Sequence, residues 1–188
     1  VARFGDDSNV VRFRQGRDAR SIPPVRWKGT DFVQTADRVA WLMDKFNPDA
    51  VFIDQGLGSA VVDILKAKGY RTTEVAFGSS AENPEYANKR TEMYARARDW
   101  LPGGMIDECP LLFGDLTSVE YDFVGAAKDK IGLERKDNLK TRIGRSPDDG
   151  DAFVLTFAGN VARRDLRLAK GAVRGRTARD VDYSVFGG

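Results

Sequence analysis

The chain has 188 residues, of which 41% are hydrophobic and 31% charged, a composition typical of one globular domain with a substantial core. It contains one cysteine, Cys109, and no histidine, which excludes internal disulfides, histidine-based triads and histidine-ligated zinc and leaves carboxylates as ligands for Mg²⁺ or Mn²⁺. The net charge is only +2, and neither a membrane-spanning apolar run nor a secretory signal is visible, so no membrane association is expected.

The first part of the chain is predicted to form an antiparallel meander. Residues 1–13 are predicted to hold the end of a first strand, a turn cluster at 5–8 and a second strand over 8–13, which is rich in β-branched residues. A third strand is expected within 19–27, where two consecutive prolines mark the edge of a sheet or an exit from it. This meander carries four arginines that we interpret as a solvated basic edge: Arg12, Arg14, Arg17 and Arg20.

The next segment is predicted to form a helix, strand, helix, strand unit. Apolar residues recur at helical spacing over 32–46. A continuous apolar run then leads to Asp54, as in a strand that is buried on both faces, and two glycines follow. A second helix is expected over 59–68 and a second strand over 71–77, which implies parallel pairing of the two strands.

The rest of the domain is predicted to be mainly helical. Ser146 and Pro147 are expected to cap and start a final, largely buried helix that continues to residue 158. Before it we expect a long helix, a short helix, a strand or strand pair around a glycine, and a short helix or ordered loop, over 85–101, 109–120, 121–131 and 136–143.

The last residues differ in composition. Residues 161–179 hold seven basic side chains against one acid. We therefore predict a domain over 1–160 and a basic C-terminal extension over 161–188. Such an extension is often only solvated, and it can also give non-specific affinity for nucleic acid.

Acidic side chains stand at positions that suit metal binding. Asp54 ends the buried strand, where ligands gather in α/β sheets, although a turn or helix-capping role is the alternative for this residue alone. Asp148 and Asp151 are three residues apart and project from nearly the same face of the last helix. Asp149 points about 100° away from Asp148, and the helix dipole alone would explain both of these acids. It explains Asp151 less well, because Asp151 lies among apolar residues and needs a basic or metal partner.

Converging carboxylates of this kind can hold two Mg²⁺ ions about 3.5–4 Å apart, which activate a water and stabilise the leaving oxygen of a phosphodiester. Asp6 and Asp7, near the first predicted strand, add further acids.

Four segments, in this order and spacing, resemble the C-terminal nuclease domain of the large terminase subunit of tailed double-stranded DNA phages. The resemblance covers about residues 1–160, and its last motif is also similar to that of Holliday-junction resolvases. The segments are residues 1–7, the strand ending in Asp54 with its glycines, Asn88-Lys89-Arg90 in a long helix, and Ser146-Pro147-Asp148-x-x-Asp151-Ala152.

The resemblance implies an α/β, RNase H-like fold, with a central mixed sheet of five or more strands, antiparallel and then parallel, flanked by helices. It implies a metal-dependent endonuclease that cuts concatemeric double-stranded phage DNA during packaging in the cytoplasm of the infected bacterium. Its partners would be an upstream ATPase domain, a portal protein and a small terminase subunit. This sequence itself shows no phosphate-binding loop for ATP.

By the same resemblance, Asp54, Asp148 and Asp151 are the catalytic ligands of two Mg²⁺ or Mn²⁺ ions, with Asp7 as an auxiliary ligand. The family's first catalytic aspartate would lie immediately before Val1. Basic residues that flank the motifs are expected to hold the DNA backbone: Arg3, Lys89, Arg90, Lys140, Arg142 and Arg145.

Two alternatives remain open at this point. The first is a junction resolvase with the same fold that acts on branched DNA. The second is a catalytically inactive RNase H-like module that binds DNA or docks a partner.

Overall fold

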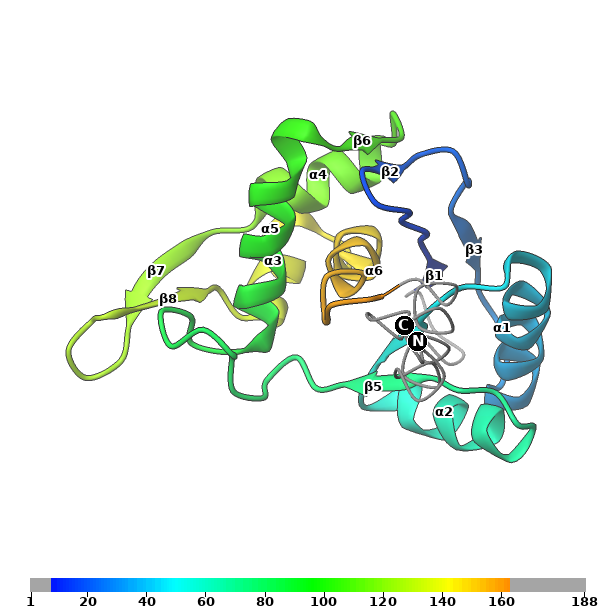
Figure 1. Cartoon of the computed structure of the whole chain (residues 1–188). Helices are drawn as coiled ribbons and strands as arrows, with labels where there is room; N and C mark the ends of the chain where they lie inside the picture. The colour runs from blue at the N-terminus through cyan, green and yellow to red at the C-terminus, as the bar shows by residue number, and fades with distance from the viewer. Residues whose placement is uncertain (1–7, 163–188) are drawn as a thin grey trace, which may run out of the picture.

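The computed structural model describes residues 8–162 and shows a mixed α/β arrangement, in which helices surround short pairs of strands (Figure 1). The features predicted within residues 1–7 and 163–188 lie outside the described residues; they include the first strand, Arg3, Asp7 and the basic extension. No helix in the described part is both long enough and apolar enough to cross a membrane.

The N-terminal strands only partly follow the predicted meander. β1 (Asn9–Val11) pairs antiparallel with β3 (Val25–Trp27), as expected, but β2 (Asp18–Ala19) pairs in parallel with the distant β6 (Met105–Ile106). The Asp18 carboxylate accepts hydrogen bonds from the backbone amides of Arg20 and Ser21, at 2.9 and 3.0 Å, and so stabilises the turn that follows β2.

The helix, strand, helix, strand unit is confirmed. α1 (Phe32–Phe46) begins with a capping box and ends where Asn47 takes a left-handed conformation, with φ 43°. β4 (Phe52–Asp54) and β5 (Thr73–Val75) pair in parallel on either side of α2 (Leu57–Ala67) in the chain. Buried apolar side chains of α1, β4 and α2 form one of two hydrophobic clusters.

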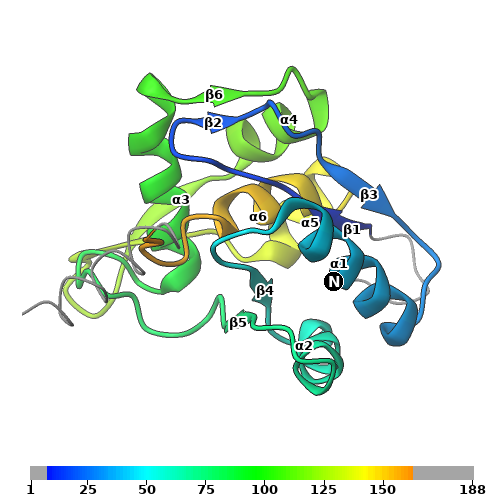
Figure 2. The ribbon, with the colours of Figure 1, turned by 45° about the vertical axis from the view of Figure 1, so that its right-hand side comes forward.

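The second half of the chain surrounds α6 (Asp148–Leu155), which is central in both orientations (Figures 1 and 2). A second hydrophobic cluster joins α6 to α3 (Lys89–Trp100) and α4 (Pro110–Ser118). Within it, the rings of Trp100, Phe153 and Phe157 pack edge to face, with centroids 5.4–5.9 Å apart.

α3 starts later than predicted, because Asn88 caps it by accepting a hydrogen bond from the backbone amide of Thr91 at 2.9 Å. A single 3₁₀ turn, η1 (Leu101–Gly103), follows α3, and α5 (Lys136–Ile143) matches the predicted helix.

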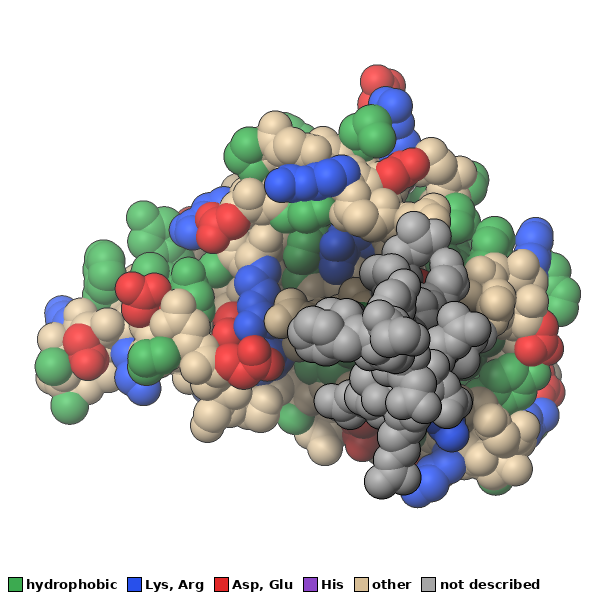
Figure 3. Space-filling model, in the orientation of Figure 1, with side chains coloured by type: hydrophobic (Ala, Val, Ile, Leu, Met, Phe, Trp, Pro, Cys, Tyr) green, Lys and Arg blue, Asp and Glu red, His purple; other side chains and the backbone are tan. Residues whose placement is uncertain are grey.

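β7 (Tyr121–Val124) and β8 (Lys130–Leu133) form an antiparallel hairpin that projects from the rest of the molecule (Figure 1). Apolar side chains lie on the surface of this hairpin (Figure 3), among them Tyr121, Phe123 and Val124. The prediction of a strand pair around a glycine is therefore confirmed.

The expected central sheet of five or more strands is not seen among residues 8–162, where the strands form four separate two-stranded pairs. β1 and β4 instead line opposite sides of a cavity of about 790 Å³. Among the described residues, no hydrogen-bonded ladder joins the β1–β3 pair to the β4–β5 pair.

The start of α6 also differs from the prediction. Pro147, not Ser146, occupies the N-cap position, and it supplies no capping side chain. Asp115 of α4 does so from outside, because its carboxylate accepts a hydrogen bond from the Gly150 amide at 2.8 Å. A Cβ atom at Gly150 would lie only 2.6 Å from Cβ of Asp115, so glycine permits the close approach of α4 and α6.

We expect Gly150→Ala to destabilise the protein by up to about 2 kcal/mol, with a central value of about 1 kcal/mol. The better helix propensity of alanine gains about 1 kcal/mol, but overpacking against α4 costs typically 1–3 kcal/mol. Urea unfolding measures the difference. Gly78→Ala is the matched control, because its added Cβ would have no neighbour within 4 Å. Equal stability of the two variants would contradict the proposed steric role of Gly150.

Candidate metal-binding and catalytic site

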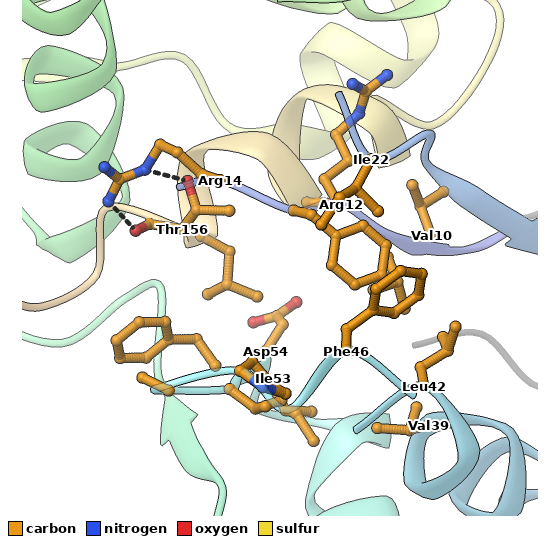
Figure 4. Close-up of a pocket in the computed structure, with 18 of the residues that line it drawn as sticks. Val10, Arg12, Arg14, Ile22, Val39, Leu42, Phe46, Ile53, Asp54 and Thr156 are labelled. Carbon is orange, nitrogen blue, oxygen red and sulfur yellow. Dashed lines mark hydrogen bonds between the residues drawn. The ribbon is translucent and has the colours of Figure 1, made fainter. Parts of the chain in front are cut away.

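The three predicted ligands, Asp54, Asp148 and Asp151, line the cavity between β1 and β4. Asp54 comes from the end of β4, and the other two come from the first turn of α6. The Asp54 carboxylate points from β4 into the space below the segment that carries Thr156 (Figure 4). The structure thus brings together acids that are about a hundred positions apart in the sequence.

Asp54 is held at the end of β4 by the local backbone. The Gln55 amide continues the pairing to β5 by donating to the Val75 carbonyl at 2.9 Å, and Gly56, with φ 82°, then turns the chain into α2. Burial raises the pKa of Asp54, and the negative charge of Asp151 raises it further, while the positive charge of Lys136 acts in the opposite direction.

Asp148 and Asp151 are oriented by different partners. Asp148 Oδ2 accepts a hydrogen bond from the Ser8 amide at 2.8 Å. Asp151 Oδ1 accepts one from the Tyr94 hydroxyl at 3.2 Å and lies 3.7 Å from Arg90 Nε. Burial and the charge of Asp151 raise the pKa of Tyr94, so its hydroxyl stays protonated and able to donate.

Lys136 is a member of this site that the sequence analysis missed. Its ammonium nitrogen lies 2.6 Å from Asp151 Oδ2, and its side chain lines the same cavity. Burial acts to lower the pKa of Lys136, but the charges of Asp151, Asp148 and Asp54 outweigh this effect and raise it. The sequence contained one indication of this role. Lys136 is the first residue of α5, where a positive charge is unfavourable next to the helix dipole, so a lysine at this position suggests an acidic partner elsewhere.

Asp149 has a different role from the dipole interaction that its position suggested. It is 4% exposed, and it accepts hydrogen bonds from Arg12 Nε at 3.0 Å and from Arg26 Nε at 2.9 Å. Burial acts to raise the pKa of Asp149, but hydrogen bonds from Arg26 and Arg12 outweigh this and lower it. Its carboxylate is therefore ionised and is occupied by arginines.

The prediction of a solvated basic edge is consequently wrong for two of its four arginines. Arg12 is buried, because α6 packs against β1, and its guanidinium points away from the cavity (Figure 4). Arg14 donates to the Thr156 carbonyl at 2.7 Å and lies over the ring of Phe157. Arg17 and Arg20 are exposed, as predicted.

The predicted DNA-contacting residues lie in varied environments. Lys89 and Arg90 are buried: Lys89 pairs with Glu92 at 2.9 Å, and Arg90 donates to the Glu134 carbonyl at 2.8 Å. Arg145 is half-buried and pairs with Asp115. Two of the predicted residues are exposed on α5, Lys140 and Arg142, while Arg3 lies outside the described residues.

The donor chemistry of the cavity suits a hard divalent cation, because Asp54, Asp148 and Asp151 are among the carboxylates that line it. Within residues 8–162, however, no three acidic side chains lie close enough together to hold an ion as they are placed. The positive charge among them is the Lys136 ammonium. The acids therefore fit Mg²⁺ or Mn²⁺, because they are oxygen ligands and line the same cavity. The Lys136 ammonium would compete with a metal ion for them.

No protein-family model and no curated protein matches this sequence. Among solved structures, the nuclease domain of the large terminase subunit of bacterial virus Sf6 is similar at 20% identity, with a TM-score of 0.66 and 86% of each chain covered. A lysine-to-alanine variant of that domain, with manganese and β-thujaplicinol, matches at 20% identity with a TM-score of 0.65 and the same coverage.

A lysine-to-alanine variant from the same phage subunit with calcium matches at 19% identity, with a TM-score of 0.62, over 80% of this chain and 82% of that one. These similarities extend over most of the described residues. This chain therefore has the fold of the nuclease domain of a phage large terminase subunit.

Proposed function

We propose that this chain is an RNase H-like endonuclease domain that depends on divalent metal ions and cuts double-stranded DNA. The observation that carries the proposal is that Asp54, Asp148 and Asp151 line one cavity of a fold shared with terminase nuclease domains. The proposed biological step is the cleavage of concatemeric phage DNA during packaging, in the cytoplasm of the infected bacterium. The proposed partners are a terminase ATPase domain, a portal protein and a small terminase subunit.

The three aspartates would hold Mg²⁺ or Mn²⁺, two ions in the proposed mechanism. When bound, such ions supply an activated water and stabilise the charge on the leaving oxygen of the phosphodiester. Tyr94 and Arg90 orient the Asp151 carboxylate through its Oδ1 atom. The other oxygen, Oδ2, faces the Lys136 ammonium, so the lysine has to release this oxygen for it to serve as a ligand.

Basic residues near the cavity would hold the phosphate backbone without reading the bases. Lys140 and Arg142 are the most accessible of the predicted residues, whereas Lys89 and Arg90 act within the protein. Linear duplex DNA and a four-way junction, compared as substrates, separate the terminase hypothesis from the resolvase alternative. DNA binding without cleavage when Mg²⁺ is present would support the inactive module.

We expect Asp54→Asn to lower Mn²⁺-dependent nicking of plasmid DNA by about 100-fold or more. The loss of a charged ligand removes several kcal/mol of transition-state stabilisation, and about 2.7 kcal/mol corresponds to 100-fold. Gel electrophoresis of supercoiled plasmid measures the nicking rate. Full activity in this variant would exclude Asp54 as a metal ligand.

The same variant should be more stable than the wild type at pH 7 when a chelator is present. Because burial raises the folded-state pKa of Asp54 above its unfolded value, stability falls as the pH rises through the interval between these two values. Asp54→Asn removes this penalty. Thermal unfolding should show a higher Tm for the variant at pH 7 and no gain at a pH of about 3, where the wild-type carboxyl is protonated. An equal difference at both pH values would contradict this origin.

We expect Lys136→Ala to tighten Mn²⁺ binding by about 10-fold, because it removes a positive charge that competes for the aspartates. Isothermal titration calorimetry with MnCl₂ measures the affinity. Lys128→Ala, in the exposed turn of the β7–β8 hairpin, is the charge-matched control and should bind Mn²⁺ like the wild type. Weaker binding by Lys136→Ala would show that the lysine supports the site instead of competing for it.

A further inference from the structure

Asp149 is a buried, ionised acid that the proposed metal site does not use. Four N–H groups from two arginines surround its carboxylate. Arg12, the residue directly after β1, reaches it through Nε and Nη2, at 3.0 and 2.6 Å, and Arg26 reaches it from β3. The third nitrogen of Arg12 pairs with Asp107 at 2.7 Å, so that two guanidinium groups face two carboxylates.

This cluster holds a helix end that has no capping side chain of its own. Consecutive residues in the first turn of α6 are each bound to a different part of the chain. Asp148 is bound to the Ser8 amide, Asp149 to the two arginines, Gly150 to Asp115 of α4, and Asp151 to Tyr94 of α3. The rotation of this turn about the helix axis is therefore set by contacts from outside α6.

That rotation decides where the two cavity-lining acids point. Successive residues of an α-helix are about 100° apart, so a turn that directs Asp149 toward the β1–β3 pair directs Asp148 and Asp151 to other sides of the helix. The arginine cluster is the contact of this turn with the most hydrogen bonds, and its members Arg12 and Asp149 are almost fully buried.

We propose that Asp149 is a positioning residue, clamped by Arg12 and Arg26, that orients the first turn of α6 so that Asp148 and Asp151 can bind metal ions together. This inference rests on the proposed function, because it takes these two aspartates as ligands. Asp149 itself offers no free oxygen to a metal, since both of its oxygens accept hydrogen bonds from arginine.

The experiment compares Asp149→Asn with Glu92→Gln. Glu92 is also an almost fully buried acid that pairs with two cations, Lys89 and Arg96, but both of these partners are on α3 and not on α6. Both variants should lose stability in urea unfolding. In calorimetric titrations of the full chain with MnCl₂, only Asp149→Asn should bind Mn²⁺ about 10- to 100-fold more weakly, as expected when a group that orients a ligand is lost.

A second, milder variant tests the proposal if Asp149→Asn does not fold. Arg26→Lys keeps the charge but loses the forked geometry, and it should weaken Mn²⁺ binding by about 3- to 10-fold. Wild-type Mn²⁺ affinity in Arg26→Lys and in folded Asp149→Asn would overturn the proposal. An equal loss of affinity in Glu92→Gln would also overturn it, because the effect would then follow from lower stability alone.

The outcomes for the two proposals remain separate. A wild-type chain that binds Mn²⁺ but does not cut plasmid DNA contradicts the proposed nuclease function, while the variants still test the clamp by metal affinity. A wild-type chain that binds no Mn²⁺ overturns both proposals.

Discussion

The structure depends on how the first turn of α6 is held. This turn carries acids that face the cavity and one that faces away, and it lacks a side-chain cap of its own. Hydrogen bonds from the residues on either side of β1, from β3, from α3 and from α4 replace the missing local contacts. These elements are therefore connected to one another through one helix end. The contacts that pack the domain here are the same contacts that orient the acids of the candidate site.

Burial acts on both Asp149 in this turn and Asp54 at the end of β4, but their charges are compensated to different extents. Asp149 has two guanidinium partners, so its pKa is lowered and its charge is compensated within the protein. Asp54, across the cavity, has no comparable pairing in the described part of the chain, and burial raises its pKa. Lys136 supplies positive charge on the cavity side. An acid whose negative charge is paired with basic side chains suits a positioning role. An acid whose charge lacks such pairing suits the role of a metal ligand.

Local patterns predicted the elements whose ends are encoded nearby. The capping box at Asp31, the left-handed Asn47 and the apolar run before Asp54 all act within a few residues, and α1, β4, α2 and β5 follow the prediction. Sheet pairing was predicted less well. β2 pairs in parallel with the distant β6, and no periodic pattern specifies which distant strand a short segment will meet.

The sequence by itself determined which chemistry is available. Without histidine, and with an acid at a buried strand end and two acids on one helix face, it indicated carboxylate ligands for a hard metal ion, and the structure brings these acids to one cavity. Only the tertiary structure decided that Lys136 lies among them and that Asp149 belongs to Arg12 and Arg26. The reason is physical: helix and strand periodicities are local, whereas the partner of a buried charge is determined by packing between separate elements, and Asp149 and its arginines are more than a hundred positions apart.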